Sequence, residues 1–413
     1  MSTQPLRVGI IGADTRASWA GASHVPAIRT QPGLALAAVA TRSAQSASAA
    51  AEAFGASRWY ADPYRLIEDD GIDIVTVAVK VPAHRELVLA ALRAGKAVYS
   101  ESPLGATLEQ TAEMASAARG LHTAIGLQGR MNPSVRRAAE LVASGRLGRV
   151  MSANVRATTF GYGPTSPAAY DYFNKAASGA SFLTITTAHV LDVVEAVLGD
   201  ITELDARTER LWPEVALVDT GGTSVREIAD HVDLVARTAL GASMSVQVLA
   251  GVESDPHFVM EVRGSKGVLK LTGSHLAGVQ VGDLSLSAGV DFAAPDAPVA
   301  SGVGPTAAAF WNGAAINVGE VYASLARDLR AGSFDTPGFA HALHNHRLVA
   351  AVERAADSGQ RQRDFGAPGS ERAHLPTGAP TITISGERHA TGKRGHSTGA
   401  AGASEARGAE SRP

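Results

Sequence analysis

Short apolar runs alternate with longer, alanine-rich segments over the first third of the chain. The apolar runs, which are typical of β-strands, span residues 6–12, 34–41, 73–79, 97–100 and 122–127. The segments long enough for crossover helices span residues 43–54, 83–94 and 108–119. Thr107 and Gln110 form a capping box at the start of the last helix. Repeated β-α-β units predict a parallel sheet, covered on both faces, that binds ligands at the carboxyl ends of its strands.

The pattern changes after a further helix that is expected at residues 132–144. Longer strands that lie closer together are then predicted at residues 150–159, 231–238, 243–249, 258–263 and 267–271. Short turns between strands, such as residues 264–267, favour a mostly antiparallel sheet. Two helices are expected to follow, at residues 317–329 and 340–358. The fold class is therefore α/β, with an N-terminal parallel-sheet domain and a C-terminal α+β domain whose large, open sheet is mostly antiparallel.

The length of 413 residues suits two domains better than one core. We expect a dinucleotide-binding domain of the Rossmann type over residues 1–127 and a domain for substrate binding and oligomerisation over residues 128–362. Residues 363–413 are rich in Gly, Ala, Ser, Pro, Arg and Glu and contain few apolar side chains. Such a composition does not offset the entropy lost on ordering, so we expect this tail to be disordered.

Composition and charge exclude several classes of protein. The net charge is -3, so the chain lacks the basic field that attracts a phosphate backbone, and no direct nucleic-acid partner is expected. The chain contains no cysteine, which rules out disulfides and cysteine-ligated metals. The N-terminal residues do not resemble a signal peptide, and no apolar run is long enough to span a membrane. We therefore expect a cytoplasmic protein that is not associated with a membrane.

The first strand runs into a candidate phosphate-binding loop. Residues 12–17 read Gly-Ala-Asp-Thr-Arg-Ala, where a dinucleotide-binding loop would have the pattern G-x-G-x-x-G/A. Asp14 replaces the middle glycine, and its carboxylate would repel a pyrophosphate unless it points away or caps the following helix. The alternative is that Gly12 serves only a tight strand-to-helix turn. The position at the first strand-to-helix junction favours the ligand.

The end of the second strand bears on the choice of cofactor. NAD-binding proteins usually place an acidic residue there, whereas this chain has Thr41, Arg42 and Ser43. Arginine and hydroxyl groups suit the 2′-phosphate of NADP, so we expect NADP to be favoured over NAD. The alternative is a solvated arginine beside a serine that caps the next helix.

Several motifs, in this order and spacing, resemble the Gfo/Idh/MocA family of glucose–fructose oxidoreductases and inositol dehydrogenases. They are SHVPAI at 23–28, ESPL at 101–104, RMNP at 130–133, SGRLG at 144–148 and AHVLD at 188–192. Within the family, the chain is most similar to the branch that contains the yeast galactose-regulon repressor. That closer resemblance is carried by Trp19, by LQGR at 127–130, by the threonines before His189, and by Asp230-His231 together with GSKG at 264–267.

The resemblance implies a Rossmann domain, a second domain whose open sheet often mediates dimerisation, and a sugar-like ligand between them. The residues that it assigns to the dinucleotide are Gly12, Ala13, Asp14, Thr15, Arg16, Thr41, Arg42, Ser43, Val79, Val81, His84, Glu101, Ser102 and Gln128. The residues that it assigns to the substrate are Arg130, Tyr170, Tyr172, Thr186 and His189.

The chain departs from the family at its catalytic residues. Dehydrogenases of the family carry a lysine in a Glu-Lys-Pro motif and an aspartate four residues before a histidine, whereas this chain has Ser102 and Ile185 at those positions and keeps only His189. An imidazole can accept a hydroxyl proton as hydride leaves the neighbouring carbon. The alternative is that His189 is a packed histidine. Lys175 is a candidate replacement for the missing ammonium, although lysines are mostly solvated.

No metal site is predicted. His341, His344 and His346 are close in sequence, but only helical spacings of three or four residues share a face, and no acidic ligand is placed beside them by sequence. Thr184, Thr186 and Thr187 precede His189 and suit either a polyol or packing against a neighbouring helix.

Two functions remain open. One is an NAD(P)-dependent oxidoreductase that acts on a sugar, polyol or related hydroxy or keto compound by hydride transfer. The other is a non-catalytic sensor that binds a dinucleotide and a protein partner. For either function we expect a homo-oligomer, a dimer or tetramer, because an exposed apolar sheet face requires a cover.

Overall fold

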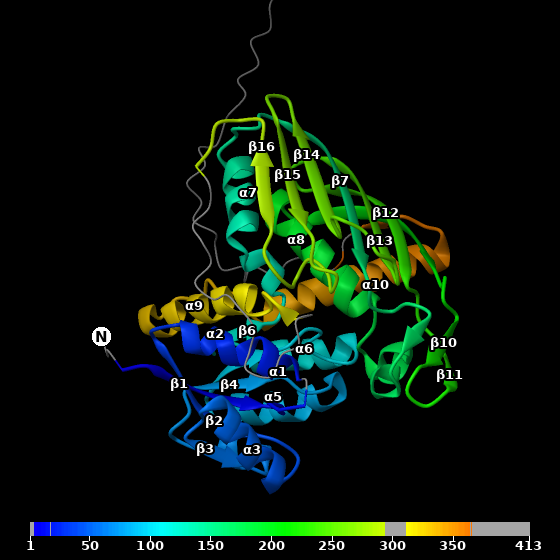
Figure 1. Cartoon of the computed structure of the whole chain (residues 1–413). Helices are drawn as coiled ribbons and strands as arrows, with labels where there is room; N and C mark the ends of the chain where they lie inside the picture. The colour runs from blue at the N-terminus through cyan, green and yellow to red at the C-terminus, as the bar shows by residue number, and fades with distance from the viewer. Residues whose placement is uncertain (1–3, 17, 294–310, 364, 366–413) are drawn as a thin grey trace, which may run out of the picture. The chain divides into compact units, whose positions relative to one another are not determined.

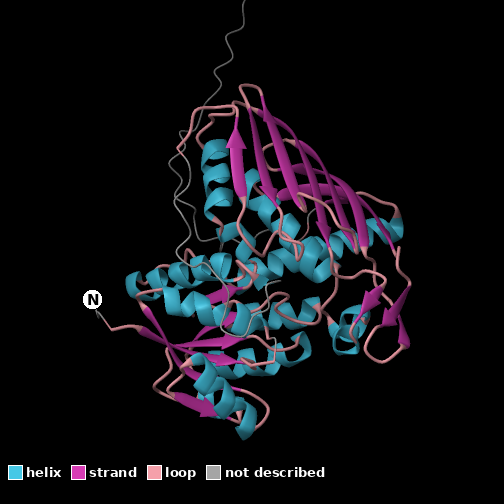
Figure 2. Cartoon of the chain, viewed as in Figure 1, coloured by secondary structure: helices cyan, strands magenta, loops and turns pink. Residues whose placement is uncertain are grey.

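The computed structural model describes residues 4–16, 18–293, 311–363 and 365, and the arrangement of its helices and strands is shown in Figures 1 and 2. Two large sheets follow one another along the chain. Ala17 of the candidate loop and nearly all of the expected tail lie outside the described residues. In the described part of the chain, no helix is long and apolar enough to cross a membrane.

The first sheet is parallel, and its strand order is β3-β2-β1-β4-β5-β6. The order reverses between β1 and β4, which is where open α/β sheets bind their ligands. The strands are β1 (Leu6–Ile11), β2 (Leu34–Ala40), β3 (Arg58–Tyr60), β4 (Ile74–Val77), β5 (Ala97–Ser100) and β6 (Thr123–Ile125). The helices are α1 (Trp19–Ala22), α2 (His24–Thr30), α3 (Ala44–Phe54), α4 (Pro63–Ile67), α5 (His84–Arg93) and α6 (Leu108–Ala117).

The five strands and three helices predicted here are confirmed, with small differences at their ends. The pattern missed β3 and α4, which have three and five residues and are too short for a periodic signal. Thr107 caps α6 as expected, because its hydroxyl accepts the Gln110 N–H at 3.3 Å. The Gln110 side chain, however, accepts the N–H of Ala106 at 3.0 Å, one residue earlier than in a standard capping box.

The second sheet is mixed and mostly antiparallel, as predicted. Its order is β16-β15-β14-β7-β13-β12-β9-β17, and β7 and β13 form its one parallel pair among the described strands. Figure 1 shows α7 (Pro133–Ala143) and α8 (Ala188–Leu198) on one side of this sheet. The strands are β7 (Val150–Thr159), β9 (Ile201–Glu209), β12 (His231–Thr238), β13 (Ser243–Ala250), β14 (Phe258–Gly264), β15 (Val268–Gly273), β16 (Ser285–Ala288) and β17 (Gln362–Arg363).

The pattern missed β9 because charged residues interrupt its apolar positions. It also missed a small sheet formed by β8 (Thr165–Ser166), β10 (Glu214–Leu217) and β11 (Gly222–Val225). Four short 3₁₀ segments contribute to the loops: η1 (Val81–Ala83), η2 (Gln128–Met131), η3 (Ala168–Asn174) and η4 (Ala176–Ser178). A π-helical segment, η5 (Leu183–Thr187), leads directly into α8.

The open face of the second sheet is more polar than expected. Outward positions of its central strands carry hydrogen-bonded polar pairs: Ser245 donates to Asn154 at 2.9 Å, and Gln247 donates to Asp233 at 2.9 Å. Val235, which is 54% exposed, is an isolated apolar side chain among them. The homo-oligomer was expected because an apolar sheet face would need a cover, and these polar outward positions do not supply that reason. The homo-oligomer stays a prediction.

The last two helices tie the second half of the chain to the first sheet. The helix α9 (Ala315–Ala331) packs against α2, and its Val321 and Tyr322 share one buried cluster with Val8 and Ile10 of β1. The helix α10 (Phe339–Ser358) packs against both α6 and β9. The helix α10 therefore contacts strands of both sheets, whereas α9 packs on the first sheet and its helix α2.

A buried ion pair holds the loop at the end of β11. The Arg226 guanidinium, 1% exposed, donates to the Asp230 carboxylate at 2.8 Å and also binds the Asn174 side chain and the carbonyls of Tyr162 and Gly163. Asp230 is fully buried, and its two oxygens accept the backbone N–H groups that follow β9. Removal of one partner would leave the other charge buried without compensation.

The substitution Arg226→Met should therefore lower the free energy of unfolding by about 3–5 kcal/mol. The measurement is urea denaturation of both proteins. The control is Arg207→Met, since the Arg207 side chain is 79% exposed beside Glu209 and an exposed pair contributes less than about 1 kcal/mol. Equal effects of the two substitutions would contradict the structural role of the buried pair.

Candidate functional site

The loop after β1 approaches the loop after β4 so closely that only glycine fits. Gly12 has a φ of 102°, and an added Cβ would lie 2.3 Å from the carbonyl oxygen of Ala78. Its N–H donates to the Ala40 carbonyl at 2.9 Å, which ties the loop to the end of β2. Gly12 thus lies where three strand ends meet at the reversal of the sheet order, and its lack of a side chain allows the loops after β1 and β4 to approach each other.

Asp14 does not cap the following helix. Its carboxylate accepts the Arg16 N–H at 2.7 Å and pairs with the Arg16 guanidinium at 3.1 Å, and these bonds lower its pKa. Ser18 caps α1 instead, since its hydroxyl accepts the N–H of Gly21. The carboxylate that would repel a pyrophosphate is therefore neutralised within its own loop.

An open cleft lies between this loop and the start of α3. Arg42 borders it with an exposed side chain that forms no ion pair within the described part of the chain. Ser43 caps α3 by accepting the Ser46 N–H, as the alternative interpretation holds, and the Thr41 hydroxyl lies 2.6 Å from that of Ser46. The residues that line the cleft are Asp14, Thr15, Arg16, Arg42, Ser43, Gln45, Ser46 and Ala49.

His84 holds two loops of the site together. Its Nε2 lies 3.0 Å from the carbonyl oxygen of Val79, and its Nδ1 lies 3.1 Å from that of Pro103 and 3.3 Å from that of Leu104. The ring is buried, and burial lowers its pKa. His84 thus links the loop that carries Val79 and Val81 to the loop that follows Ser102.

Glu101 heads a buried network that the sequence did not reveal. Its carboxylate lies 2.7 Å from Nε2 of His24, whose Nδ1 lies 3.0 Å from the Tyr322 hydroxyl. The Tyr322 hydroxyl lies 2.7 Å from that of Thr76. The SHVPAI motif contains His24, but no sequence signal connected it with Tyr322, almost three hundred residues away.

His189 lies on the first turn of α8 and is buried. Its Nδ1 has no hydrogen-bond partner among the described residues. Burial lowers its pKa to about 4, against the opposing effect of the Asp192 and Glu101 charges. The ring is therefore neutral at neutral pH, and its Nδ1 has a hydrogen-bonding position that no described residue fills.

Two carboxylates of α8 bind two histidines of α10. Arg130 of η2 donates to Asp192 at 2.7 Å, and His341 also contacts both Arg130 and this carboxylate. One turn along each helix, Nε2 of His344 lies 2.8 Å from the Glu195 carboxylate. Asp192 and Glu195 of α8 are thus the acidic partners of His341 and His344, which the sequence did not place beside these histidines.

The third histidine faces elsewhere, since Nδ1 of His346 lies 2.9 Å from the Thr111 hydroxyl. One group of side chains has metal-ligating types at close range, namely Glu195, Asp200 and His344, whose ligand atoms lie within 4.8 Å of one another. Within this group, Glu195 and His344 are paired with each other at 2.8 Å.

The residues predicted before α8 separate into two places. Lys175 donates to the Val225 carbonyl at 3.0 Å and lies 3.9 Å from Glu227, so it belongs to the small sheet. Tyr172 instead reaches the first sheet, where the ammonium of Lys80 lies 4.1 Å from its ring centroid. Tyr170 is 43% exposed and stacks on Phe173.

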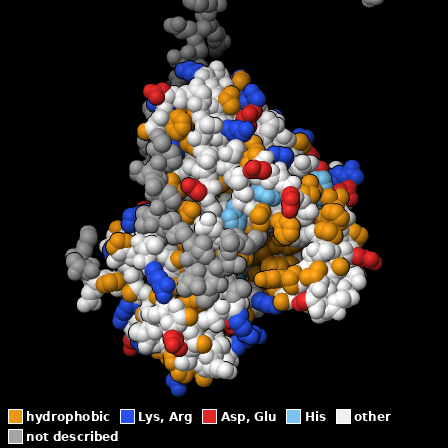
Figure 3. Space-filling model, viewed as in Figure 1, with side chains coloured by type: hydrophobic (Ala, Val, Ile, Leu, Met, Phe, Trp, Pro, Cys, Tyr) orange, Lys and Arg blue, Asp and Glu red, His pale blue; other side chains and the backbone are white. Residues whose placement is uncertain are grey.

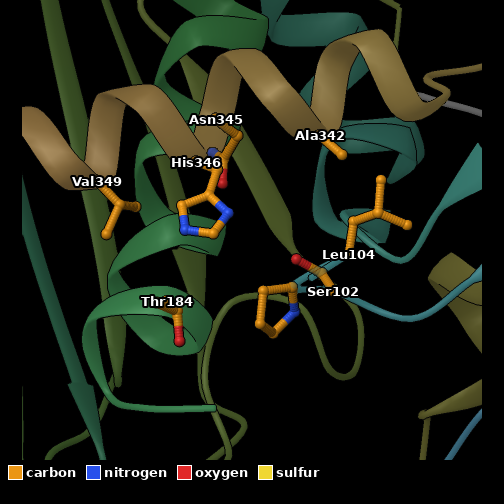
Figure 4. Close-up of a pocket in the computed structure, with 8 residues that line it drawn as sticks. Ser102, Leu104, Thr184, Ala342, Asn345, His346 and Val349 are labelled. Atoms are coloured by element: carbon orange, nitrogen blue, oxygen red, sulfur yellow. The ribbon is translucent and has the colours of Figure 1, made fainter. Parts of the chain in front are cut away.

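Ser102, at the family's lysine position, lines a small cavity beneath α10 (Figure 4). Thr184 borders the same cavity, and both lie across it from Asn345 and His346, which project from α10. The Thr184 hydroxyl already donates a hydrogen bond to the nearby Gly179 carbonyl at 2.8 Å. Gln128, in η2, and Thr186, three residues before His189, are both buried. The side-chain oxygen Oε1 of Gln128 has no hydrogen-bond partner among the described residues.

Comparisons with known sequences agree with this geometry. Residues 6–128 match the family described as "Oxidoreductase family, NAD-binding Rossmann fold", and residues 133–273 match "Gal80p, C-terminal domain". The chain is 32% identical over 288 residues to Dehydrogenase aclE of Aspergillus oryzae, covering 66% of this chain and 78% of that protein. It is 27% identical to the galactose/lactose metabolism regulatory protein GAL80 of Saccharomyces cerevisiae, covering 65% of this chain and 67% of that protein.

Solved structures share the fold. A super-repressor mutant of Gal80p from Saccharomyces cerevisiae superposes with a TM-score of 0.76 at 21% identity, covering 88% of this chain and 99% of that one. Levoglucosan dehydrogenase in complex with NADH and L-sorbose has a TM-score of 0.72 at 22% identity, covering 87% and 99%. The same architecture is thus found in a regulator and in a dehydrogenase.

The substitution Gly12→Ala should weaken binding of NADH and NADPH at least about tenfold, because the methyl group would collide with the Ala78 carbonyl and force the loop to move. Titration by nicotinamide fluorescence measures the effect. Gly161→Ala is the control, since the nearest atom to its added Cβ is 3.6 Å away. Unchanged affinity in Gly12→Ala would show that this loop does not hold the cofactor.

The neutral state of His189 also makes a prediction for stability. Its folded pKa lies below its unfolded value, so the unfolded chain binds the proton first and stability falls as the pH drops from about 6.5 towards 4. Between pH 8 and pH 5 this residue should account for a loss of about 2 kcal/mol. His189→Gln should remove that part of the loss in urea denaturation, whereas His122→Gln, remote from α8, should retain it. Identical pH profiles for His189→Gln and the parent would refute this assignment.

Proposed function

Because the chain belongs to the Gfo/Idh/MocA family of NAD-binding oxidoreductases, we propose that it transfers hydride between a nicotinamide dinucleotide and a sugar, polyol or related hydroxy or keto compound. The observation that carries this proposal is His189, a buried and neutral imidazole with an unused Nδ1. The Gly12 turn at the reversal of the strand order, where the loops after β1 and β4 meet, is the place at which such sheets bind a dinucleotide.

In this proposal His189 transfers the proton, and the surrounding charged residues support it. The dinucleotide, when bound, supplies hydride transfer. His189 accepts the proton of the substrate hydroxyl, and the nearby Asp192 and Glu101 charges stabilise the imidazolium that forms. Arg130 and His341 hold Asp192 in place, and His24 holds Glu101. Proton transfer is thereby assigned to His189 although Ser102 and Ile185 replace the family's lysine and aspartate.

The test is nicotinamide reduction with a panel of sugars and polyols. On a substrate that the parent protein oxidises, His189→Ala should lower kcat by about 10²–10⁴-fold, the usual contribution of general acid–base catalysis. Cofactor affinity should be unchanged, and His122→Gln should retain full activity. A kcat in His189→Ala equal to that of the parent would remove His189 from the mechanism.

A second candidate is a regulator that binds the dinucleotide without turnover. The absence of the family's lysine and aspartate supports it, as does the match of residues 133–273 to the C-terminal domain of Gal80p. Saturable NAD(P)H binding with no turnover across the panel, together with dinucleotide-dependent binding of a protein partner, would favour the regulator over the enzyme.

For the cofactor we propose a preference for NADP over NAD. Arg42 borders the cleft after β2 without an ion pair in the described structure, and no carboxylate follows β2 to bind the ribose hydroxyls of NAD. One charge-assisted contact at an exposed site should favour NADP by about 10- to 100-fold, less at high salt.

Titration of both cofactors checks this preference. Arg42→Ala should bring the two affinities close together, whereas Arg65→Ala, an exposed arginine of α4 that lies outside the cleft, should preserve the ratio. Equal affinities in the parent protein, or an unchanged ratio in Arg42→Ala, would leave Arg42 as a surface residue only.

A further inference from the structure

Lys80 lies at the edge of the first sheet where the candidate cofactor loops meet. It follows β4 between Val79 and Val81, and the carbonyl of Ala78, two residues earlier, abuts Gly12. His84 fixes the Val79 carbonyl at 3.0 Å. The backbone that carries Lys80 is therefore anchored, while its side chain is exposed.

The ammonium of Lys80 points from this edge towards the second half of the chain. It lies 4.1 Å from the ring centroid of Tyr172 in η3, and that ring packs on Phe173 with centroids 4.1 Å apart. Burial raises the pKa of Tyr172 to about 12, so the phenol is neutral and offers its face to the cation without a charge. Lys80 thus crosses from the first sheet to η3.

The molecule is hollowed in this region. Figure 3, drawn from the same side as Figure 1, shows a hollow with apolar walls between the first sheet's helices and the strands β10 and β11. The segment η3, which carries Tyr172, contacts β11. The ammonium of Lys80 is exposed, so an anion can reach it, and water and salt screen the attraction between them.

Several charged side chains around these loops are already paired. Glu101 binds His24, Arg130 binds Asp192, and Lys175 is engaged by Glu227 and a backbone carbonyl. Lys80 has no carboxylate within 4 Å in the described structure and is held by an aromatic ring alone. A bound anion would supply the missing counter-charge.

Lys80 and Ser102, which stands at the family's lysine position, follow neighbouring strands of the first sheet. The strands β4 and β5 are neighbours, with Val77 opposite Ser100. Lys80 follows Val77 by three residues, and Ser102 follows Ser100 by two. The two positions therefore extend from adjacent strand ends, and an ammonium absent from one is present on the other.

We propose that Lys80 binds an anionic group of the substrate, so that the site prefers a carboxylated sugar or similar hydroxy acid to its neutral counterpart. This inference rests on the sugar-like ligand of the proposed function and adds the class of that ligand. Lys80 binds the carboxylate, and His189 acts on a hydroxyl of the same molecule.

The experiment compares matched ligands on the full chain saturated with NADPH. Isothermal titration at low salt measures galacturonate against galactose and glucuronate against glucose. The parent protein should bind each uronate about tenfold or more tightly than the neutral sugar, as expected for one charge-assisted contact. Lys80→Gln should bring the ratio close to one, and the control Lys270→Gln, an exposed lysine on β15, should keep it.

Other outcomes would overturn the inference in distinguishable ways. Equal binding of uronates and neutral sugars by the parent, with oxidation of the sugars that depends on His189, would refute the role of Lys80 and leave the proposed function intact. Uronate binding that depends on Lys80, without turnover of any sugar or uronate, would support the role of Lys80 and contradict the proposed hydride transfer. Tenfold weaker NADPH binding in Lys80→Gln with an unchanged ligand ratio would assign Lys80 to the cofactor phosphates, and failure of every sugar and uronate to bind would reject both proposals.

Discussion

The carboxylate of Asp192 is the point on which three parts of the chain converge. It is fully buried on α8. It accepts a hydrogen bond from Arg130 of η2, which follows the first sheet in the chain, and it contacts His341 of α10. A buried carboxylate is stable only when charged partners surround it, so the segments that supply those partners are constrained to meet there. The contacts of Asp192 with Arg130 and His341 thus join η2, α8 and α10.

The same arrangement sets the chemistry of its neighbour. His189 lies one turn before Asp192 and has no such partner of its own, so burial controls its protonation. One helix turn thus carries a carboxylate whose pKa is lowered by Arg130 and His341 and an imidazole whose pKa is lowered by burial. The contrast arises from which side chains of η2 and α10 reach each position, because both residues are almost completely buried.

The sequence predicts most of the strands because their apolar residues repeat with a clear period, and it predicts the Gly12 turn because the turn is local. It does not predict β3 or β9, of which one is too short and the other too polar. The contacts of His24 with Tyr322 and of Lys80 with Tyr172 join residues far apart in the chain, and no local pattern records such a contact. Sequence alone therefore identifies Lys175 as the candidate ammonium, whereas the structure shows that residue engaged with the small sheet.

The burial of Tyr322 has a consequence for the order in which the protein is made. The first sheet and its own helices end by Ile125, yet the buried cluster on one face of that sheet includes Val318, Val321, Tyr322 and Leu325 of α9. During translation, that face therefore stays exposed until the ribosome has added roughly two hundred further residues, a delay of ten seconds or more at about 5–20 residues per second. For that interval the nascent chain presents an apolar surface of the kind that chaperones bind, so the late arrival of a single helix sets when the first part of the protein becomes protected.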